Sequence, residues 1–383
     1  MDETVFRAFL PELVAIRHRL HQMPETGYEE RQTSAFVADL LEGWGLSVTR
    51  GVAATGLVAT LDRGGDGRAI GLRADMDGLP VIEETGAVYA SRTPGMMHAC
   101  GHDGHTTMLI GAAFRLLHDD EFKGKVHFIF QPAEETAGGA ARMIDEGLFE
   151  RFPCEAVFAL HNYPGLAAGR FSARHGAMMA AIDAATVTVR GTGGHGARPE
   201  DTVDPVVAAA SIVMALQTVV SRNVPPQEAG VITIGAFHAG SACNVIPEEA
   251  VLEVSLRATD PAIRERLCRR FEEIVRAQAA SFSAEAHIDW QTGYPVTMND
   301  PASVDLAASV IVDTFGPDAY EPLARPMMGS EDFAFMLEKV KGAYLFLGNG
   351  DSAGLHSSRY DFDDALLERG PAFLHALTRR FFA

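Results

Sequence analysis

The chain has 383 residues and a formal net charge of −19, so nucleic acid and anionic membrane surfaces are excluded as expected partners because both would repel it. Its length and its ordinary mixture of 47% hydrophobic and 22% charged residues predict a globular protein of two domains. The four cysteines are scattered, the start shows no secretory pattern and no apolar run approaches the length of a membrane helix, so we expect a cytoplasmic protein without a disulfide framework.

Helical and strand-like segments alternate along the first 180 residues. Apolar residues recur at helical spacing within the first 45 residues, which predicts two helices. Short apolar runs at residues 56–61, 69–72, 126–130 and 156–160 predict buried strands, and residues 105–117 predict a helix between two of them. This alternation predicts an α/β fold whose sheet is covered by helices on both faces.

Polar residues follow three of these predicted strands. They are Asp75 and Asp77 after the second strand, Glu134 and Glu135 after the third, and His161 after the fourth. In open α/β sheets, ligands bind at the edge formed by the carboxyl ends of the strands. We therefore expect these side chains to contribute to one site at that edge.

Residues 182–293 predict a second unit inserted into the first. Its expected order is strand, helix, strand, strand, helix, strand, which is the split βαβ arrangement of a ferredoxin-like sandwich. These elements are expected at residues 182–189, 203–220, 231–237, 250–258, 262–279 and 285–290. The chain then returns with a strand at residues 343–347 and a final helix from about residue 363. We predict a first domain of residues 1–181 and 294–383, and an inserted domain of residues 182–293.

The segment from His98 to His105 reads His-Ala-Cys-Gly-His-Asp-Gly-His and has the character of a metal site. Thiolate sulfur and imidazole nitrogen both bind first-row divalent metals. The crowding of these groups in front of a predicted helix favours ligands at Cys100 and His102 over an inert buried thiol. We expect His98 and His105 to support the site rather than to bind metal.

Glu134 and Glu135 are adjacent carboxylates leaving a buried strand, where they would repel one another unless a cation or a proton intervenes. Because neighbouring side chains point in different directions, one can bind metal while the other handles the proton of a bound water. His356 adds an imidazole from a glycine-rich loop after the last strand. Five ligands for two ions are then available: Cys100, His102, Glu135, His161 and His356.

Three groups of residues have predicted supporting roles. Asp77 is expected to accept the second N–H of a metal-binding histidine. His195, in the glycine-rich segment 191–199, could donate to a developing oxyanion if the inserted domain closes over the site, and no nucleotide-loop lysine follows it. Asn244 and Arg257 are candidates for binding a substrate carboxylate, and a structural role for each stays open.

These motifs together resemble the aminoacylase and carboxypeptidase-like co-catalytic metallopeptidases, in particular the amidohydrolase branch that contains hippurate hydrolase and plant auxin-conjugate hydrolases. The resemblance runs over nearly the whole chain and is carried by residues 73–80, 98–106, 131–135, 159–161, 193–199, 244–247, 329–333 and 355–356. It implies a mixed-sheet α/β/α catalytic domain with an inserted ferredoxin-like α+β domain that acts as a lid and in dimerisation.

The resemblance also implies a role for each site residue. Cys100 would bridge two divalent ions, and His102, Glu135, His161 and His356 would be the other ligands. Glu134 would be the general base and acid, Asp77 would orient the metal centre, and Asp75 stands where relatives carry a ligand histidine. His195 would reach the substrate oxyanion, in some relatives from the partner subunit of a dimer.

The implied reaction is hydrolysis of N-acyl amino acids such as N-benzoyl or N-acetyl derivatives. The ligand set suits manganese or zinc, and nickel or cobalt are also possible. The implied assembly is a homodimer or homotetramer. Alternatives are a dipeptidase or carboxypeptidase, an N-acetyl-diaminopimelate deacetylase, an amidase with Cys100 as nucleophile, and a binding protein without catalysis.

Overall fold

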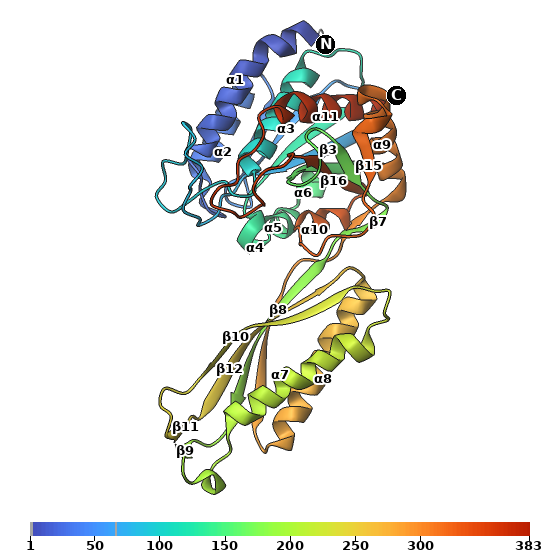
Figure 1. The fold of residues 1–383 in the computed structure, drawn as a ribbon. Helices are drawn as coiled ribbons and strands as arrows, with labels where there is room; N and C mark the ends of the chain where they lie inside the picture. The colour runs from blue at the N-terminus through green and yellow to red at the C-terminus, as the bar shows by residue number, and fades with distance from the viewer. Residues whose placement is uncertain (1–2, 66) are drawn as a thin grey trace. The chain divides into compact units, whose positions relative to one another are not determined.

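The computed structural model describes residues 3–65 and 67–383, so Met1 and Asp2 of the predicted first domain and Asp66 lie outside the described residues. The chain divides into two compact units (Figure 1). Unit 1 comprises Met1–Gly176, Met298–Arg325 and Asp332–Ala383, and unit 2 comprises Ala177–Thr297 and Pro326–Glu331. The insertion predicted at residues 182–293 lies inside unit 2.

A mixed eight-stranded sheet with the order β1-β2-β4-β3-β5-β16-β6-β15 forms the centre of unit 1. The central neighbours β4, β3, β5 and β16 run parallel, whereas β1 with β2, β2 with β4 and β16 with β6 are antiparallel. The strands are β1 (Ser47–Val52), β2 (Gly56–Asp62), β3 (Ala69–Asp75), β4 (Lys125–Gln131), β5 (Ala156–Tyr163), β6 (Phe171–Ala173), β15 (Tyr320–Pro322) and β16 (Gly342–Gly348). The predicted mixed α/β fold is confirmed.

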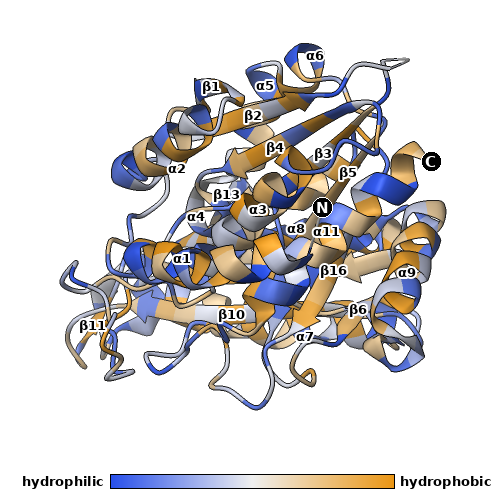
Figure 2. Ribbon diagram, turned by 90° about the horizontal axis from the view of Figure 1, so that it is seen from above, coloured by the Kyte–Doolittle hydropathy of each residue, from blue (hydrophilic) through white to orange (hydrophobic). Residues whose placement is uncertain are grey.

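The central strands are apolar because both faces of the sheet are covered, and β3 and β16 are buried at every position. Figure 2 shows β2, β3, β4 and β5 in mainly hydrophobic colours. Phe128 and Phe130 pack in a core with residues of the helices on one side, and α5 and α10 lie on the other side. The helices named here are α1 (Glu3–His21), α2 (Arg31–Gly43), α3 (His102–Leu117), α5 (Gly139–Asp145), α9 (Pro301–Phe315), α10 (Phe333–Leu337) and α11 (Leu366–Phe382).

Two helices begin at other residues than the sequence pattern predicts. Helix α3 starts at His102 rather than at about 105, because Gly101 has the left-handed conformation (φ 87°) and the helix follows directly. Helix α11 starts at Leu366 rather than at about 363, because Asp363 accepts a hydrogen bond from the Ala365 amide in a turn before the helix. The earlier start of α3 places His102 in its first turn.

Unit 2 is built on a four-stranded antiparallel sheet with the order β10-β12-β8-β13. The chain order strand, helix, strand, strand, helix, strand is the predicted ferredoxin-like arrangement. Asp204 and Asp260 cap the two helices through the amides of the first turn, and each is followed by a proline. The elements are β8 (Ala181–Arg190), α7 (Pro205–Asn223), β10 (Gly230–Ala239), β12 (Glu249–Ala258), α8 (Pro261–Ser281) and β13 (Glu285–Thr292).

Helix α7 is long and apolar enough to cross a membrane by length and composition alone. This is weak evidence for a membrane span, because the core helix of a globular domain has the same length and composition. Ile212 and Leu216 pack in the core of unit 2, as the core helix of a globular domain does. Met214 is 71% exposed, so the apolar character of α7 is shared between the core and the outer surface of unit 2.

Candidate metal centre

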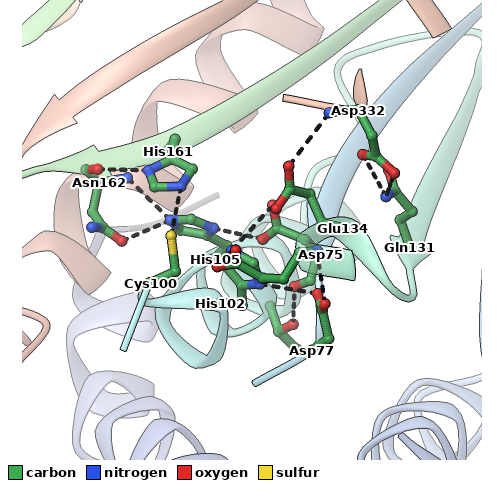
Figure 3. A network of polar contacts seen from close by, with 12 residues as sticks. Asp75, Asp77, Cys100, His102, His105, Gln131, Glu134, His161, Asn162 and Asp332 are labelled. Atoms are coloured by element: carbon green, nitrogen blue, oxygen red, sulfur yellow. Dashed lines mark hydrogen bonds and ion pairs between the residues drawn. The ribbon is translucent and has the colours of Figure 1, made fainter. Parts of the chain in front are cut away.

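The carboxyl ends of β4, β3 and β5 meet at one edge of the sheet of unit 1, because these strands are parallel neighbours. Asp75 ends β3 and pairs with Gln131 at the end of β4, while His161 lies near the end of β5. Glu134 begins α4 (Glu134–Ala137), and two residues separate it from the end of β4. Together with the loop before α3, these strand ends form a buried polar cluster (Figure 3).

Cys100, His102 and His161 bring three ligand-type atoms within 4.8 Å of one another. Within this group, Cys100 Sγ lies 3.5 Å from His161 Nε2. A second group within the same limit consists of Cys100, Glu135 and His356, in which His356 Nε2 lies 3.2 Å from Glu135 Oε1. Cys100 belongs to both groups, so its sulfur lies between two sets of potential ligands.

The ring orientations of His102 and His161 fit metal binding. His102 Nδ1 lies 3.1 Å from Asp77 Oδ1, and His161 Nδ1 lies 2.6 Å from the carbonyl oxygen of Asn162. Because a carboxylate and a carbonyl only accept hydrogen bonds, both rings carry a proton on Nδ1, which leaves Nε2 as the atom available to a metal. His102 Nε2 is buried without a hydrogen bond, 3.8 Å from the nearest oxygen of Asp75.

Several carboxylates lie close to His102 and Cys100 and change the pKa of both side chains. Burial disfavours a charged His102 ring, but Asp75 and Asp77 outweigh burial and raise the pKa of His102 to about 10. Burial, and then Glu135 and Glu134, raise the pKa of the Cys100 thiol well above its usual range. A divalent cation among these groups would reverse both effects, since it stabilises a thiolate and neutral imidazole ligands. The donor set therefore fits a metal site.

Asp75 and His105 hold the strands and helix α3 together around the cluster. Asp75 Oδ2 accepts a hydrogen bond from Arg73 Nη1 at 2.7 Å, and Asp75 Oδ1 lies 2.6 Å from His105 Nδ1. The other ring nitrogen of His105 lies 2.8 Å from Asn162 Oδ1. Both Asp75 oxygens are thus engaged in hydrogen bonds with protein groups. We therefore assign Asp75 a supporting role beside the cluster.

Gly101 separates Cys100 from His102 and leaves no room for a side chain. A Cβ atom at this position would lie 2.0 Å from Asn162 Oδ1 and 2.6 Å from Tyr360 Oη. We expect Gly101→Ala to lower the free energy of unfolding by about 2–5 kcal/mol, because left-handed strain adds to overpacking. Urea unfolding of the variant measures this loss. Gly95→Ala is the matched control, because Gly95 also has a positive φ (76°) but a Cβ there meets nothing within 4 Å; equal losses in both variants would contradict the expectation.

A second buried polar network, which the sequence analysis missed, holds the first turn of α3. Asp103 Oδ2 lies 2.9 Å from His21 Nδ1 and 3.5 Å from Arg17 Nη1, and both partners come from the buried face of α1. Burial opposes protonation of His21, but Asp103 outweighs it and raises the pKa of His21 to about 9. The one sequence feature that could have indicated this network is the i, i+4 spacing of Arg17 and His21 on an apolar helix face.

The loop that carries Glu134 is fixed by Asp332, another residue without a predicted role. Asp332 Oδ1 accepts hydrogen bonds from Gln131 Nε2 at 2.7 Å and from Arg73 Nη2 at 3.0 Å. The Asp332 amide in turn donates to Glu134 Oε1 at 3.4 Å. Glu134 is 7% exposed, so its carboxylate is held in a nearly dry environment next to His102 and Glu135.

Three predicted site residues lie in unit 2. His195 is exposed in the short strand β9 (Gly194–His195), which pairs with β11 (Val245–Ile246), so Asn244 lies beside it. Arg257 pairs with Ile182 at the other end of the sheet, and its Nη1 donates to the Met328 carbonyl at 2.9 Å. The structure therefore brings Asn244 and His195 together but does not bring Arg257 to them.

Comparison with known proteins gives one family and several relatives that cover nearly the whole chain. The sequence pattern of the peptidase family M20/M25/M40 matches residues 71–380. The chain is 43% identical over 370 residues to hippurate hydrolase of Campylobacter jejuni, covering 97% of this chain and 96% of that protein. It is 37% identical over 374 residues to N-acetyl-L-cysteine deacetylase of Bacillus subtilis, covering 96% and 88%. A crystal structure described as a dinuclear metal-binding peptidase of the M20 family from Bacillus subtilis superposes with a TM-score of 0.85 at 30% identity, covering 98% and 99%.

Proposed function

The chain belongs to the peptidase family M20/M25/M40 and to its amidohydrolase branch, and from this premise we propose that it hydrolyses the amide bond of N-acyl amino acids. The products are a carboxylate and a free amino acid. The chain is a hydrolase by its family membership; the substrate class is the proposal. It is supported by two relatives whose names refer to an N-benzoyl and an N-acetyl amino acid.

The observation that carries the proposal is the position of Glu134. One of its carboxylate oxygens lies within 4.8 Å of ligand-type atoms of His102 and Glu135. The same carboxylate accepts a hydrogen bond from the Asp332 amide. A carboxylate beside potential metal ligands can take the proton of an attacking water. A binding protein without catalysis would have no use for this group.

We propose two divalent ions, manganese or zinc, with nickel or cobalt also suited to these donors. Cys100 would be shared by both ions, His102 and His161 would serve with it on one side, and Glu135 and His356 on the other. Bound ions would supply a water of lowered pKa and positive charge for the developing oxyanion. Asp77 would keep the His102 ring in the orientation that its 3.1 Å contact defines.

Within the proposed reaction, Glu134 removes a proton from the attacking water and later delivers it to the leaving nitrogen. Its burial keeps competing water away and strengthens its interaction with the reacting groups. His195 is proposed as a donor to the substrate oxygen, from its own subunit or from a partner. Asn244, which lies beside His195, is the stronger candidate for a substrate contact, because Arg257 already uses Nη1 within unit 2.

We propose that unit 2 acts as a lid and carries the contact between subunits of a homodimer or homotetramer. Met214 and Val207 on α7 are 71% and 50% exposed, and Phe237 on the edge strand β10 is 40% exposed. Exposed apolar side chains near an unpaired strand edge are typical of an interface. The mass of the protein in solution, measured by sedimentation, tests this assembly.

The rival reading of Cys100 as a nucleophile has less support. A cysteine nucleophile needs a thiolate, and such thiols lie near positive groups. Burial and the carboxylates around Cys100 raise the pKa of its thiol instead. In this setting the sulfur becomes a thiolate only with a cation beside it, which is the role of a ligand.

A substrate panel with controlled metal content tests the proposed function. It contains N-benzoyl, N-acetyl and indoleacetyl amino acids, a dipeptide and N-acetyl-diaminopimelate. We expect hydrolysis of at least one N-acyl amino acid, loss of that activity in metal-depleted protein, and recovery with manganese or zinc. Full activity after metal depletion would indicate a cysteine amidase, and cleavage of the dipeptide alone would indicate a peptidase.

A further inference from the structure

Ala133, the residue before Glu134, has an unusual backbone conformation. Its φ of 54° and ψ of 44° place it in the left-handed region, which a residue with a Cβ adopts only when its surroundings hold it there. The peptide that follows sets the direction in which Glu134 leaves β4. Whatever holds Ala133 in this conformation therefore also fixes the position of the Glu134 carboxylate.

Glu30 holds the Ala133 backbone. Its Oε1 accepts a hydrogen bond from the Ala133 amide at 2.8 Å, across 103 positions of the chain, and its Oε2 accepts one from the Thr55 hydroxyl. The side chain is 0% exposed and has no part in the proposed reaction or in the 4.8 Å groups. A buried carboxylate whose two oxygens both accept hydrogen bonds from ordered groups holds those groups in place.

The segments around Glu30 and Ala133 are also held closely in place. Glu30 stands directly before α2, whose first turn fixes its backbone, and Thr55 stands in the tight connection before β2. A Cβ atom at Gly27 would lie 2.8 Å from Ala133 Cβ, and one at Gly139 would lie 1.7 Å from Pro132 O. The chain thus packs closely against the loop at both Ala133 and Pro132.

We propose that Glu30 is a positioning residue for the general base: it acts through the Ala133 amide to keep the Glu134 carboxylate in place for proton transfer. The proposal rests on the proposed function, in which Glu134 is the base. It assigns Glu30 no contact with substrate or metal. Its loss should therefore lower kcat and leave both KM and the metal content of the protein unchanged.

The test compares Glu30→Ala with Glu30→Gln. The amide of glutamine keeps an oxygen for the Ala133 amide and can donate to the Thr55 hydroxyl, so both contacts survive. We expect Glu30→Ala to lower kcat about 10–100-fold, because displacements of about 1 Å cost this much, and Glu30→Gln to keep at least half of kcat. If Glu30→Ala does not fold, Glu30→Asp replaces it, since its shorter side chain cannot reach Ala133.

Asp119→Ala is the matched control. Asp119 is also a buried acid that accepts hydrogen bonds from the Glu121 amide and the His375 ring, and it forms an ion pair with Arg379; it follows the C-terminal end of α3, whereas the cluster lies at the N-terminal end of that helix. It should lose comparable stability and keep kcat. Hydrogen exchange of the Ala133 amide gives a second readout: exchange should accelerate in Glu30→Ala only.

The outcomes separate the two proposals. Three results would overturn the positioning role: wild-type kcat in folded Glu30→Ala, an equal loss of kcat in Glu30→Gln, or a change in KM or metal content instead of kcat. None of them affects the loss of kcat expected for Glu134→Gln, on which the proposed function depends. In the Glu134→Gln background, removal of Glu30 should cost no further activity, and an additional loss would also count against the positioning role. Wild-type activity of Glu134→Gln alone would defeat the proposed function itself, whatever the exchange of the Ala133 amide shows.

Discussion

Glu134→Gln is expected to lower kcat by about 10²–10⁴-fold while the protein keeps its fold and its metal. Glutamine has nearly the same volume and can still accept the hydrogen bond from the Asp332 amide. It cannot take a proton from water at neutral pH, so the proposed base is removed without a change of shape. Steady-state kinetics and metal analysis of the purified variant measure the two effects separately.

Glu135→Gln is the matched control for this prediction, because it makes the same chemical change at the adjacent position. Glu135 shares a group with Cys100 and His356, so its loss should weaken metal binding, and activity should recover in part at high metal concentration. Glu134→Gln should not recover. Near-normal turnover of Glu134→Gln, or its recovery with added metal, would show that the two neighbours do not divide the work as proposed.

The edge of the sheet that carries the cluster could be predicted because it depends on local patterns. Buried parallel strands are continuous apolar runs, and their carboxyl ends fall on one edge by topology. Asp75, Glu134 and His161 each follow such a run in the sequence, and the structure places β4, β3 and β5 side by side. The order of the ferredoxin-like unit was equally visible, since each of its helices and strands has its own periodicity.

The supports of the cluster could not be predicted in this way. Glu30 stands in the polar segment Tyr28-Glu29-Glu30-Arg31, which reads as a solvated loop, and only the fold brings Ala133 to it and buries it. Asp332 likewise depends on Gln131, 201 positions away. Such residues have no local pattern because their role arises from a distant partner.

The shared role expected for Asn244 and Arg257 failed for a different reason. Both have the chemistry to bind a carboxylate, and chemistry alone suggested a common role. Their separation is set by the extended strand β12 (Glu249–Ala258), which begins after Asn244 and has Arg257 near its other end; Glu249 pairs with Arg190 and Arg257 with Ile182, at opposite ends of β8. The residue types alone do not carry this information, although the predicted strand at residues 250–258 does.

Cys100→Ala is expected to lower kcat at least about 100-fold and to reduce the bound metal from two ions to at most one per chain. The sulfur is the one donor present in both ligand groups, so its loss affects two sites at once. Metal analysis after dialysis measures the stoichiometry. The rise of Tm on adding manganese or zinc, which follows from binding to the folded state alone, should be smaller in the variant than in the wild type.

Cys154→Ala controls for the removal of a thiol as such, at a half-buried position. Its sulfur lies close to Gly71 of β3 and belongs to none of the 4.8 Å groups among the described residues, so metal content and kcat should stay at wild-type values. The same pair separates a ligand from a nucleophile. If Cys100 attacked the substrate, Cys100→Ala would lose activity with two ions still bound, and metal-depleted wild-type protein would remain active. Loss of metal and activity together in Cys100→Ala, with neither lost in Cys154→Ala, is the pattern expected of a metal ligand and not of a nucleophile.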